Sequence, residues 1–334
     1  MGNPPAAGDR EETLNDVLLQ RLKAEPEAEA CRLVNREGQV EAVTVRRLME
    51  KAFAYAEQYG RPSPERKIIG VCLYHGLDLH AAFVGGLLSG HVPTMLPPPS
   101  PRMEISKYSD SFARMIKHLG PAFVVLDPSV HSRLAELSLN DLRETRLIDT
   151  VGVPDTGSRE TWQADPDEVA LLQHSSGTTG LQKGIALSHR AILHHNRVYT
   201  EKLGITREDV IVSWLPLYHD MGFIACFILP LLFGIIFVEM SPFDWVIQPV
   251  MLLEQIWRQR GTLCWLPNFS FNFMAQSIRP SQIPKDLDLS GVRAWINSSE
   301  TVYHSSGQAF LNRFQPHGVN LNQFTASYAM AENV

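Results

Sequence analysis

Residues 169–184 read VALLQHSSGTTGLQKG, an apolar run followed by a loop of serines, threonines and glycines that carries one lysine. The run 169–172 is typical of a buried strand. Glycine permits close approach to a ligand, while the hydroxyl groups and the Lys183 ammonium supply donors and positive charge, so the loop suits a polyphosphate. It is not a Walker loop, because Gln182 stands where that pattern needs glycine and no Ser or Thr follows Lys183. A polar surface turn is the alternative, but the position after a strand and the lysine favour phosphate binding.

On both sides of this loop, short apolar runs alternate with stretches of helical periodicity. The strand-like runs are 67–73, 123–126, 169–172, 210–214 and 235–238, and the helical stretches are 14–23, 79–89, 190–203 and 249–260. This alternation predicts an α/β fold with a largely parallel sheet. Residues 1–12 are polar with paired prolines and are predicted to be disordered. A Gly/Pro-rich stretch at 151–167 predicts a first α/β subdomain, 13–165, and a second, 166–334, which contains the loop.

Composition narrows the class of protein. The 334 residues hold 30 Lys and Arg against 36 Asp and Glu, which disfavours nucleic acid as the main partner because phosphate backbones are bound by basic surfaces. The 4 cysteines lie far apart, without zinc-site or disulfide spacing, which is typical of a reduced, cytoplasmic protein with no signal peptide. The longest uncharged run, 222–238, is interrupted by Pro230 and Gly234. It predicts a buried helix followed by a strand, and no transmembrane segment.

The loop also resembles the signature of a known family. Residues 175–184 match the Ser/Thr-Ser/Gly-Gly-Thr-Thr/Ser-Gly-x-Pro-Lys-Gly motif of adenylate-forming enzymes, except that Gln182 replaces the usual proline. That family includes acyl-CoA synthetases, nonribosomal peptide adenylation domains and fatty acyl-AMP ligases. The resemblance implies that the ATP phosphates are bound by Ser175, Ser176, Gly177, Thr178, Thr179, Gly180 and Lys183. Lys183 is then also a catalytic residue, and the missing proline implies a more mobile loop.

A second match concerns the acid substrate. Residues 214–223, WLPLYHDMGF, resemble the stretch of fatty acyl-AMP ligases that closes over the carboxylate end of the acyl group. An imidazole such as His219 can donate a hydrogen bond to an acyl carbonyl, and a glycine lets a helix begin close to a ligand. Outside such a motif, a lone histidine is more often a cap or core residue. The resemblance implies a substrate site formed by His219, Asp220, Gly222, Phe269 and Ser298. The apolar segments 223–232 and 265–274 suit an acyl tunnel, although plain core packing is the commoner role for such residues.

Two further matches concern the nucleotide. Residues 297–302, NSSETV, resemble NGAEPV, whose backbone lines the adenine pocket of the family, with Ser298, Ser299 and Glu300 in the corresponding places. Side chains at Ser298 and Thr301 in place of Gly and Pro predict a narrower pocket. Residues 328–332, YAMAE, resemble YGMAE, which implies that Tyr328, Met330 and Ala331 lie by the adenine and that Glu332 holds Mg²⁺, a cation that prefers oxygen ligands. Ala331 in place of threonine favours the acyl-AMP ligase branch.

The resemblance spans residues 14–334 and implies a fold and a reaction. The fold is the large N-terminal α/β domain of an adenylate-forming enzyme, with stacked mixed sheets flanked by helices and a distorted barrel, incomplete at its C-terminal end and without the small C-terminal domain. The reaction uses ATP and Mg²⁺ to convert a carboxylic acid, of fatty or medium-chain type, into an acyl-adenylate and pyrophosphate. The acyl group then passes to the phosphopantetheine thiol of an acyl carrier protein. This chain alone is expected to be weakly active or inactive.

Several alternatives stay open or are disfavoured. CoA is the alternative acceptor, which makes the enzyme an acyl-CoA synthetase. A degenerate nucleotide- or acyl-binding module without the C-terminal domain is the non-enzyme alternative. A serine hydrolase is disfavoured because the chain has no GxSxG elbow, and a dinucleotide enzyme because it has no GxGxxG. A zinc enzyme lacks HExxH and paired cysteines.

Overall fold

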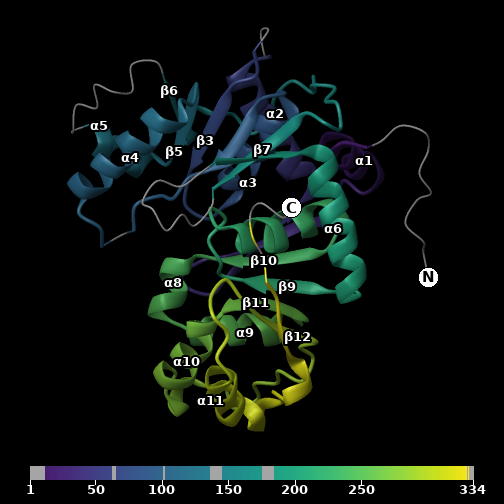
Figure 1. The fold of residues 1–334 in the computed structure, drawn as a ribbon, viewed down its shortest axis with the longest axis vertical. Helices are drawn as coiled ribbons and strands as arrows, with labels where there is room; N and C mark the ends of the chain where they lie inside the picture. The colour runs from purple at the N-terminus through teal and green to yellow at the C-terminus, as the bar shows by residue number, and fades with distance from the viewer. Residues whose placement is uncertain are drawn as a thin grey trace.

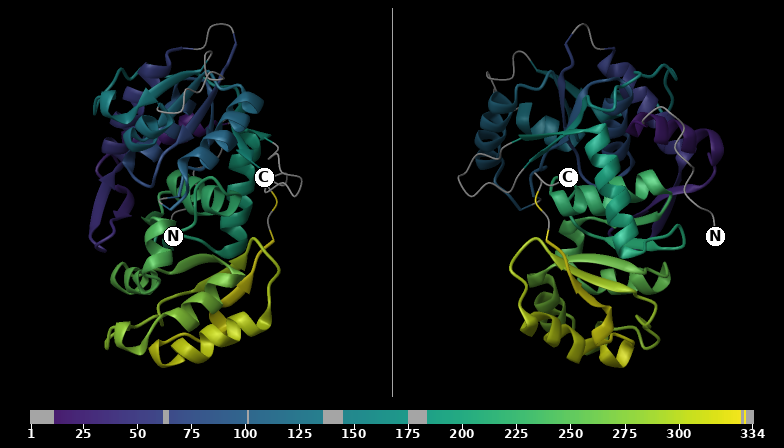
Figure 2. Two further views of the ribbon diagram at one scale, coloured as in Figure 1. Left: turned by 90° about the vertical axis from the view of Figure 1, so that its left-hand side faces the viewer. Right: turned by 45° about the vertical axis from the view of Figure 1, so that its right-hand side comes forward.

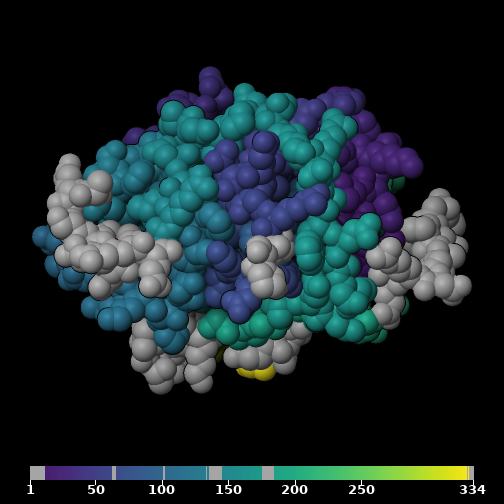
Figure 3. All heavy atoms as spheres, turned by 90° about the horizontal axis from the view of Figure 1, so that it is seen from above, coloured from purple at the N-terminus to yellow at the C-terminus, as the bar shows by residue number. Residues whose placement is uncertain are grey.

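The computed structural model describes residues 12–61, 65–100, 102–135, 145–174, 184–328 and 330. These residues form two sheets that lie one above the other along the long axis of the molecule, with helices against their faces (Figures 1 and 2). The face seen from above in Figure 3 is built mainly from the purple-to-teal, N-terminal part of the chain, which contains most of the upper sheet.

The upper sheet has six strands and the lower sheet has seven. The order of the upper sheet is β6 (Arg146–Asp149), β5 (Phe123–Leu126), β3 (Ile68–Cys72), β4 (Val92–Met95), β7 (Val169–His174) and β8 (Gly184–Ser188). The order of the lower sheet is β13 (Phe324–Ala326), β12 (Ala294–Ser298), β11 (Leu263–Pro267), β9 (Val210–Ser213), β10 (Ile236–Met240), β1 (Glu29–Val34) and β2 (Val40–Thr44). Each sheet is parallel except for one antiparallel pair at an edge, β7 with β8 and β1 with β2. The predicted α/β fold with mixed sheets is confirmed.

Helices alternate with most of the strands along the chain, as predicted. They are α1 (Leu14–Ala24), α2 (Val45–Tyr59), α3 (Leu77–Leu88), α4 (Ile105–Leu119), α5 (Pro128–Ala135), α6 (His189–Leu203), the π-helix η3 (Met221–Ile228), α7 (Leu229–Phe233), α8 (Pro242–Ile247), α9 (Val250–Arg258), α10 (Asn268–Ser277) and α11 (His304–Phe314). The helix predicted at 14–23 is α1, which begins where Thr13 and Asp16 form a capping box. The strand predicted at 123–126 is β5.

The uncharged run 222–238 forms η3, α7 and the start of β10, so the predicted buried helix followed by a strand is confirmed. Every residue of η3 is buried. Within the described ranges, no helix combines the length and the apolar character needed to cross a membrane.

The predicted boundary at residue 165 does not separate the two sheets. β1 and β2, from the first predicted subdomain, belong to the lower sheet, whereas β7 and β8, from the second, belong to the upper one. One continuous hydrophobic core spans both sheets, with α2 and α3 packed so closely that a Cβ on Gly85 would lie 2.7 Å from the Ala52 carbonyl oxygen. The division at 165 stays a prediction.

The expected barrel and the expected disordered N-terminal segment lie only partly within the described residues. The strands β1–β13 of the described residues all belong to the two sheets, so the expected barrel is not formed within this part of the chain. Residues 1–11 of the predicted disordered segment lie outside the described residues. Glu12 is described and accepts a hydrogen bond from Arg197 at 2.8 Å.

The buried Asp209 carboxylate, just before β9, binds Arg293, just before β12, and so links the amino-terminal ends of these two strands. Arg293 donates to both oxygens of Asp209, at 2.9 and 2.8 Å, and the Thr262 hydroxyl donates to Oδ1 at 2.7 Å. Burial by itself would raise the pKa of Asp209, but these hydrogen bonds outweigh it and lower the pKa below 3.8. A lowered carboxyl pKa stabilises the folded protein above the unfolded value, and the stabilisation is lost as the pH falls through the folded value.

We therefore expect Asp209→Asn to lower the free energy of unfolding at pH 7 by about 1.5–3 kcal/mol, the usual range for hydrogen bonds to a charged group. Urea unfolding at pH 7 and at pH 3 measures this, and the difference from wild type should shrink at pH 3. Asp167→Asn is the control. Asp167 forms a similar bidentate ion pair with Arg190, but on the exposed surface, where such pairs contribute little to stability. Equal losses for the two variants would contradict the prediction.

Candidate active site

The predicted phosphate loop connects two paired strands. Ser175, Ser176, Gly177, Thr178, Thr179, Gly180 and Lys183 lie outside the described residues, as do Ala331 and Glu332. The residues that flank the loop, His174 and Gly184, are direct partners across β7 and β8. His174 is half-buried, and neither of its two buried ring nitrogens has a hydrogen-bond partner in the described part of the chain. Burial, followed by the nearby His118, lowers its pKa. The loop therefore leaves and re-enters the upper sheet beside a neutral imidazole.

Four parallel strands of the lower sheet deliver the other motifs to one edge. β9, β11, β12 and β13 run in the same direction, so their carboxyl ends lie together. Residues 214–220 follow β9, α10 follows β11, residues 299–302 follow β12, and Tyr328 lies just beyond β13. In open α/β sheets, ligands bind at this carboxyl edge.

Contacts between these segments hold them together at the carboxyl edge of the sheet. The Ser299 hydroxyl lies 3.6 Å from the Met221 sulfur, which joins the 299–302 segment to η3. The Phe269 backbone N–H donates to the Glu300 carboxylate at 2.6 Å, which joins the same segment to α10. Ser299 has a φ of 71°, a left-handed conformation that is uncommon for a residue other than glycine. Strained backbone of this kind clusters at functional sites.

His219 and Asp220 lie at the entry to η3. Asp220 caps the helix by accepting a hydrogen bond from the Met221 backbone N–H at 2.8 Å. The His219 ring packs against Tyr218, with ring centres 4.9 Å apart, and still reaches solvent. Partial desolvation lowers its pKa below 6.5, against the opposing effect of Asp220. His219 is therefore mainly neutral near pH 7 and keeps one N–H to donate.

Gly222 makes the turn before η3 compact. A Cβ at this position would lie 2.5 Å from the Pro216 carbonyl oxygen and 3.0 Å from the Leu215 Cβ. The close approach that the structure shows is thus between the helix and its own preceding loop. Its predicted contact with the substrate stays a prediction.

We expect Gly222→Ala to lower the free energy of unfolding by about 1–3 kcal/mol, the usual cost of overpacking, because backbone has to move to admit the methyl group. Chemical denaturation monitored by circular dichroism measures the loss. Gly291→Ala is the control, since a Cβ there would meet nothing within 4 Å. An unchanged unfolding midpoint in Gly222→Ala would show that the loop relaxes without cost.

The nucleotide motif at 297–302 borders a cavity of about 220 Å³. Its walls include Asn297 of β12, Tyr303 and residues of α11 and β13. The Asn297 amide donates to Asn268 at 3.1 Å, while its buried Oδ1 and the buried Ser298 hydroxyl have no partner in the described part of the chain. Tyr328 is 84% exposed and Met330 is 39% exposed. An unpartnered buried oxygen in the wall of a cavity, as at Asn297, suits a polar ligand.

An aromatic group that extends beyond the motifs lies at the same edge. Trp214 and Trp245 stack with ring centres 3.8 Å apart and planes 4° apart, and Phe269 meets both rings edge-on. Sequence reasoning included Trp214 and Phe269 but missed Trp245, because α8 carries no recognisable motif. Phe223, Phe227 and Phe271 are fully buried and pack within the core. Their burial agrees with plain core packing, and their part in an acyl tunnel stays a prediction.

The expected magnesium ligand lies outside the described residues. Among the residues that the structure describes, no group of three or more His, Cys, Asp or Glu side chains is arranged to hold a metal ion. The four cysteines are free and buried.

Comparisons with known proteins agree with this arrangement. The family model for AMP-binding enzymes matches residues 20–334. The chain is 30% identical to the medium-chain-fatty-acid–[acyl-carrier-protein] ligase JamA of Moorena producens, over 96% of this chain and 55% of that protein. A fatty acyl-adenylate ligase from L. pneumophila, solved in complex with acyl adenylate and pyrophosphate, matches with a TM-score of 0.86 at 26% identity, over 96% of this chain and 55% of that chain.

A more distant structure shares the fold alone. The adenylation domain of a keto acid-selecting nonribosomal peptide synthetase module matches with a TM-score of 0.85 at 21% identity, over 97% of this chain and 60% of that chain. The chain thus belongs to the AMP-binding enzyme family, the adenylate-forming ligases, and spans about half the length of the curated relatives that it matches.

Proposed function

We propose that the protein activates a fatty or medium-chain carboxylic acid with ATP and passes the acyl group to the phosphopantetheine thiol of an acyl carrier protein. The observation that carries the proposal is the meeting of residues 214–221, 269 and 299–300 at the carboxyl edge of the lower sheet. These are the segments whose motifs resemble the acid and nucleotide sites of the family. Cytoplasmic residence is part of the same proposal and rests on the sequence.

The first step joins two anions. A carboxylate oxygen attacks the α-phosphorus of ATP, the bond to the pyrophosphate oxygen breaks, and an acyl-adenylate forms. Charge neutralisation and alignment carry such a reaction more than a general base does. We assign the phosphates to Lys183 and to the hydroxyl and backbone groups of the 175–180 loop. A bound Mg²⁺ would neutralise phosphate charge, and we assign it to Glu332.

The carboxylic acid substrate and the adenine base of ATP are both assigned to the carboxyl edge of the lower sheet. Neutral His219 donates a hydrogen bond to the acyl carbonyl, and Asp220 holds the start of η3 by capping it. The adenine lies by Ser298, Ser299, Glu300, Tyr328, Met330 and Ala331. In the second step a thiol attacks the acyl carbon, a thioester forms, and AMP leaves.

Calorimetric titration of ATP and Mg²⁺ into the wild type and into Lys183→Ala tests the nucleotide site. We expect the affinity to fall by about 10- to 150-fold, because a hydrogen bond to a charged group contributes about 1.5–3 kcal/mol. Lys285→Ala, on the exposed surface, is the control. An unchanged affinity in Lys183→Ala would remove this lysine from the site.

The acceptor is tested with the natural full-length protein. It is incubated with ATP, a fatty acid and either CoA or a phosphopantetheinylated acyl carrier protein, and the thioester is measured by mass spectrometry. Acyl carrier protein as the acceptor supports the proposal. Transfer to CoA alone makes the protein an acyl-CoA synthetase, and nucleotide binding without turnover makes it a binding module.

A further inference from the structure

A group of buried polar side chains lies between the two sheets, outside every motif. It consists of His75, which follows β3, His80 of α3 and Glu239 of β10, here called the Glu239 cluster. His80 Nε2 lies 2.7 Å from Glu239 Oε2, and His75 Nε2 lies 3.4 Å from Glu239 Oε1. The His80 and Glu239 side chains are each 1% exposed and His75 is 11% exposed. Because its members come from both halves of the molecule, the cluster links the upper sheet to the lower one.

The cluster contains one ion pair and one neutral imidazole. Burial opposes the charge of His80, but Glu239 outweighs it and raises the pKa of His80 to about 10. Burial would likewise raise the pKa of Glu239, and the two histidines lower it instead. For His75, burial outweighs the opposing effect of the Glu239 charge, so the pKa of His75 is lowered. His75 therefore contributes hydrogen-bonding groups without adding a second positive charge.

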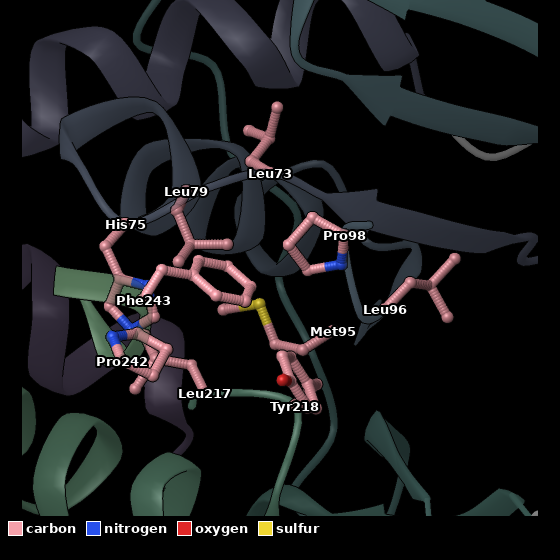
Figure 4. A pocket seen from close by; sticks show the side chains of 10 residues that line it. All are labelled: Leu73, His75, Leu79, Met95, Leu96, Pro98, Leu217, Tyr218, Pro242 and Phe243. Carbon is pink, nitrogen blue, oxygen red and sulfur yellow. The ribbon is translucent and has the colours of Figure 1, made fainter. Parts of the chain in front are cut away.

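Both histidines contact the segment that we assign to the acid. The His80 ring packs on Phe227 of η3, with ring centres 4.6 Å apart and planes 30° apart. His75 lies by the backbone of Leu215, in the loop that leads from β9 to His219, and this backbone partly opposes the lowering of the His75 pKa. The same loop supplies Leu217 and Tyr218 to a crevice that His75 also lines (Figure 4).

This crevice is too small for a ligand. Its volume is about 10 Å³, which is space for about one water molecule. Around His75 its walls are apolar, including Leu79, Pro242 and Phe243 (Figure 4). His75 is thus held between apolar side chains, with Glu239 on one side and the Leu215 backbone on the other.

Buried ion pairs are a poor source of stability, because desolvation of the two charges consumes most of their attraction. Their best-attested use is to specify one arrangement of the groups around them. We propose that the Glu239 cluster positions residues 214–220, with His75 as the positioning residue that holds the loop carrying His219. The consequence for acid binding rests on the proposed function, whereas the effect on the loop does not.

Hydrogen exchange followed by mass spectrometry tests the effect on the loop. His75→Phe keeps a ring in the apolar crevice and removes both nitrogens, while His80 and Glu239 stay paired. We expect amide exchange in peptide 214–220 to accelerate by at least about tenfold, with no change in α11. His75→Gln, which keeps a side-chain donor, should restore part of the protection. His91→Phe is the matched control, since His91 is another buried histidine, located beside Phe123.

Unchanged exchange in peptide 214–220 of folded His75→Phe would overturn the proposal. So would a general acceleration that includes α11, because that indicates lost global stability. Acceleration confined to 214–220 supports it.

Ligand affinity provides a second readout. A non-hydrolysable acyl-sulfamoyl adenosine reaches the acid site, whereas ATP does not carry an acyl group. We expect His75→Phe to weaken the acyl ligand at least about tenfold and to leave ATP within about twofold. Equal losses for both ligands would refute a role through His219. If the wild type binds neither ligand, the proposed function fails, and the exchange experiment still decides whether the cluster positions the loop.

Discussion

Replacing His80 with leucine is expected to lower the free energy of unfolding by about 3–5 kcal/mol, because the Glu239 carboxylate is then buried without its cation. Glu239 is 1% exposed, and its second neighbour, His75, is neutral and 3.4 Å away. No described lysine or arginine forms an ion pair with Glu239 in place of His80. Urea unfolding at pH 6 measures the loss.

The double variant His80→Leu/Glu239→Leu separates the cost of an orphaned charge from the value of the pair. Replacing both partners with apolar side chains of similar volume is often neutral or stabilising. We therefore expect the double variant to recover most of the stability that His80→Leu loses. A double variant as unstable as the single one would show that the pair itself holds the two sheets together.

The pair also gives stability a defined pH dependence. The pKa of His80 is raised from 6.5 to about 10 in the folded state, so its contribution is fully present below pH 6.5 and is lost as the pH rises towards 10. The pKa of Glu239 is lowered from 4.5, so its contribution is present above pH 4.5 and is lost as the pH falls below that value. The wild type should therefore lose stability relative to the double variant between pH 6.5 and 10. A constant difference over that range would contradict the assignment of charge to His80.

The local elements were predictable where one physical signal dominates. The apolar run at 123–126 is bounded by turns and buried on both faces, which is the pattern of a parallel strand, and β5 has these bounds. The apolar spacing at 14–23 predicted α1, and in the structure Leu14 and Leu18 face the core while Thr13 caps the helix. Such signals depend only on neighbouring residues.

The assembly of the site was predictable only through the motifs. The contact between Ser299 and Met221 joins residues 78 positions apart, which no local pattern encodes. The strand order of the lower sheet brings β1 beside β10, across the boundary that the Gly/Pro-rich stretch suggested. Glu239 gave no signal, because one acidic residue in IFVEM is indistinguishable in sequence from a residue at a strand end. Its partners become visible only when α3 is packed against β10.

Affinity for acyl-sulfamoyl adenosines is expected to rise by about 150-fold when the acyl chain grows from eight to twelve carbons. Burying one methylene contributes about 0.8 kcal/mol, so four contribute about 3 kcal/mol if the chain enters an apolar site. The aromatic group of Trp214, Trp245 and Phe269 stands at the edge where the acid is assigned, and Phe269 is 48% exposed. Calorimetry over the series of chain lengths measures the slope.

Sulfamoyl adenosine without an acyl chain separates the nucleotide contribution, which should be the same for every member of the series. Phe269→Ala is the matched variant: its side chain is half-exposed, so its removal should reduce the gain per methylene more than it reduces the stability of the fold. A flat or falling affinity with chain length would exclude a fatty acid and favour an aryl or short acid, because a site that gains nothing from added methylenes does not bury them. Since ATP and the acyl-free ligand report on the nucleotide site alone, that outcome would change the assigned substrate and leave the adenylate-forming chemistry in place.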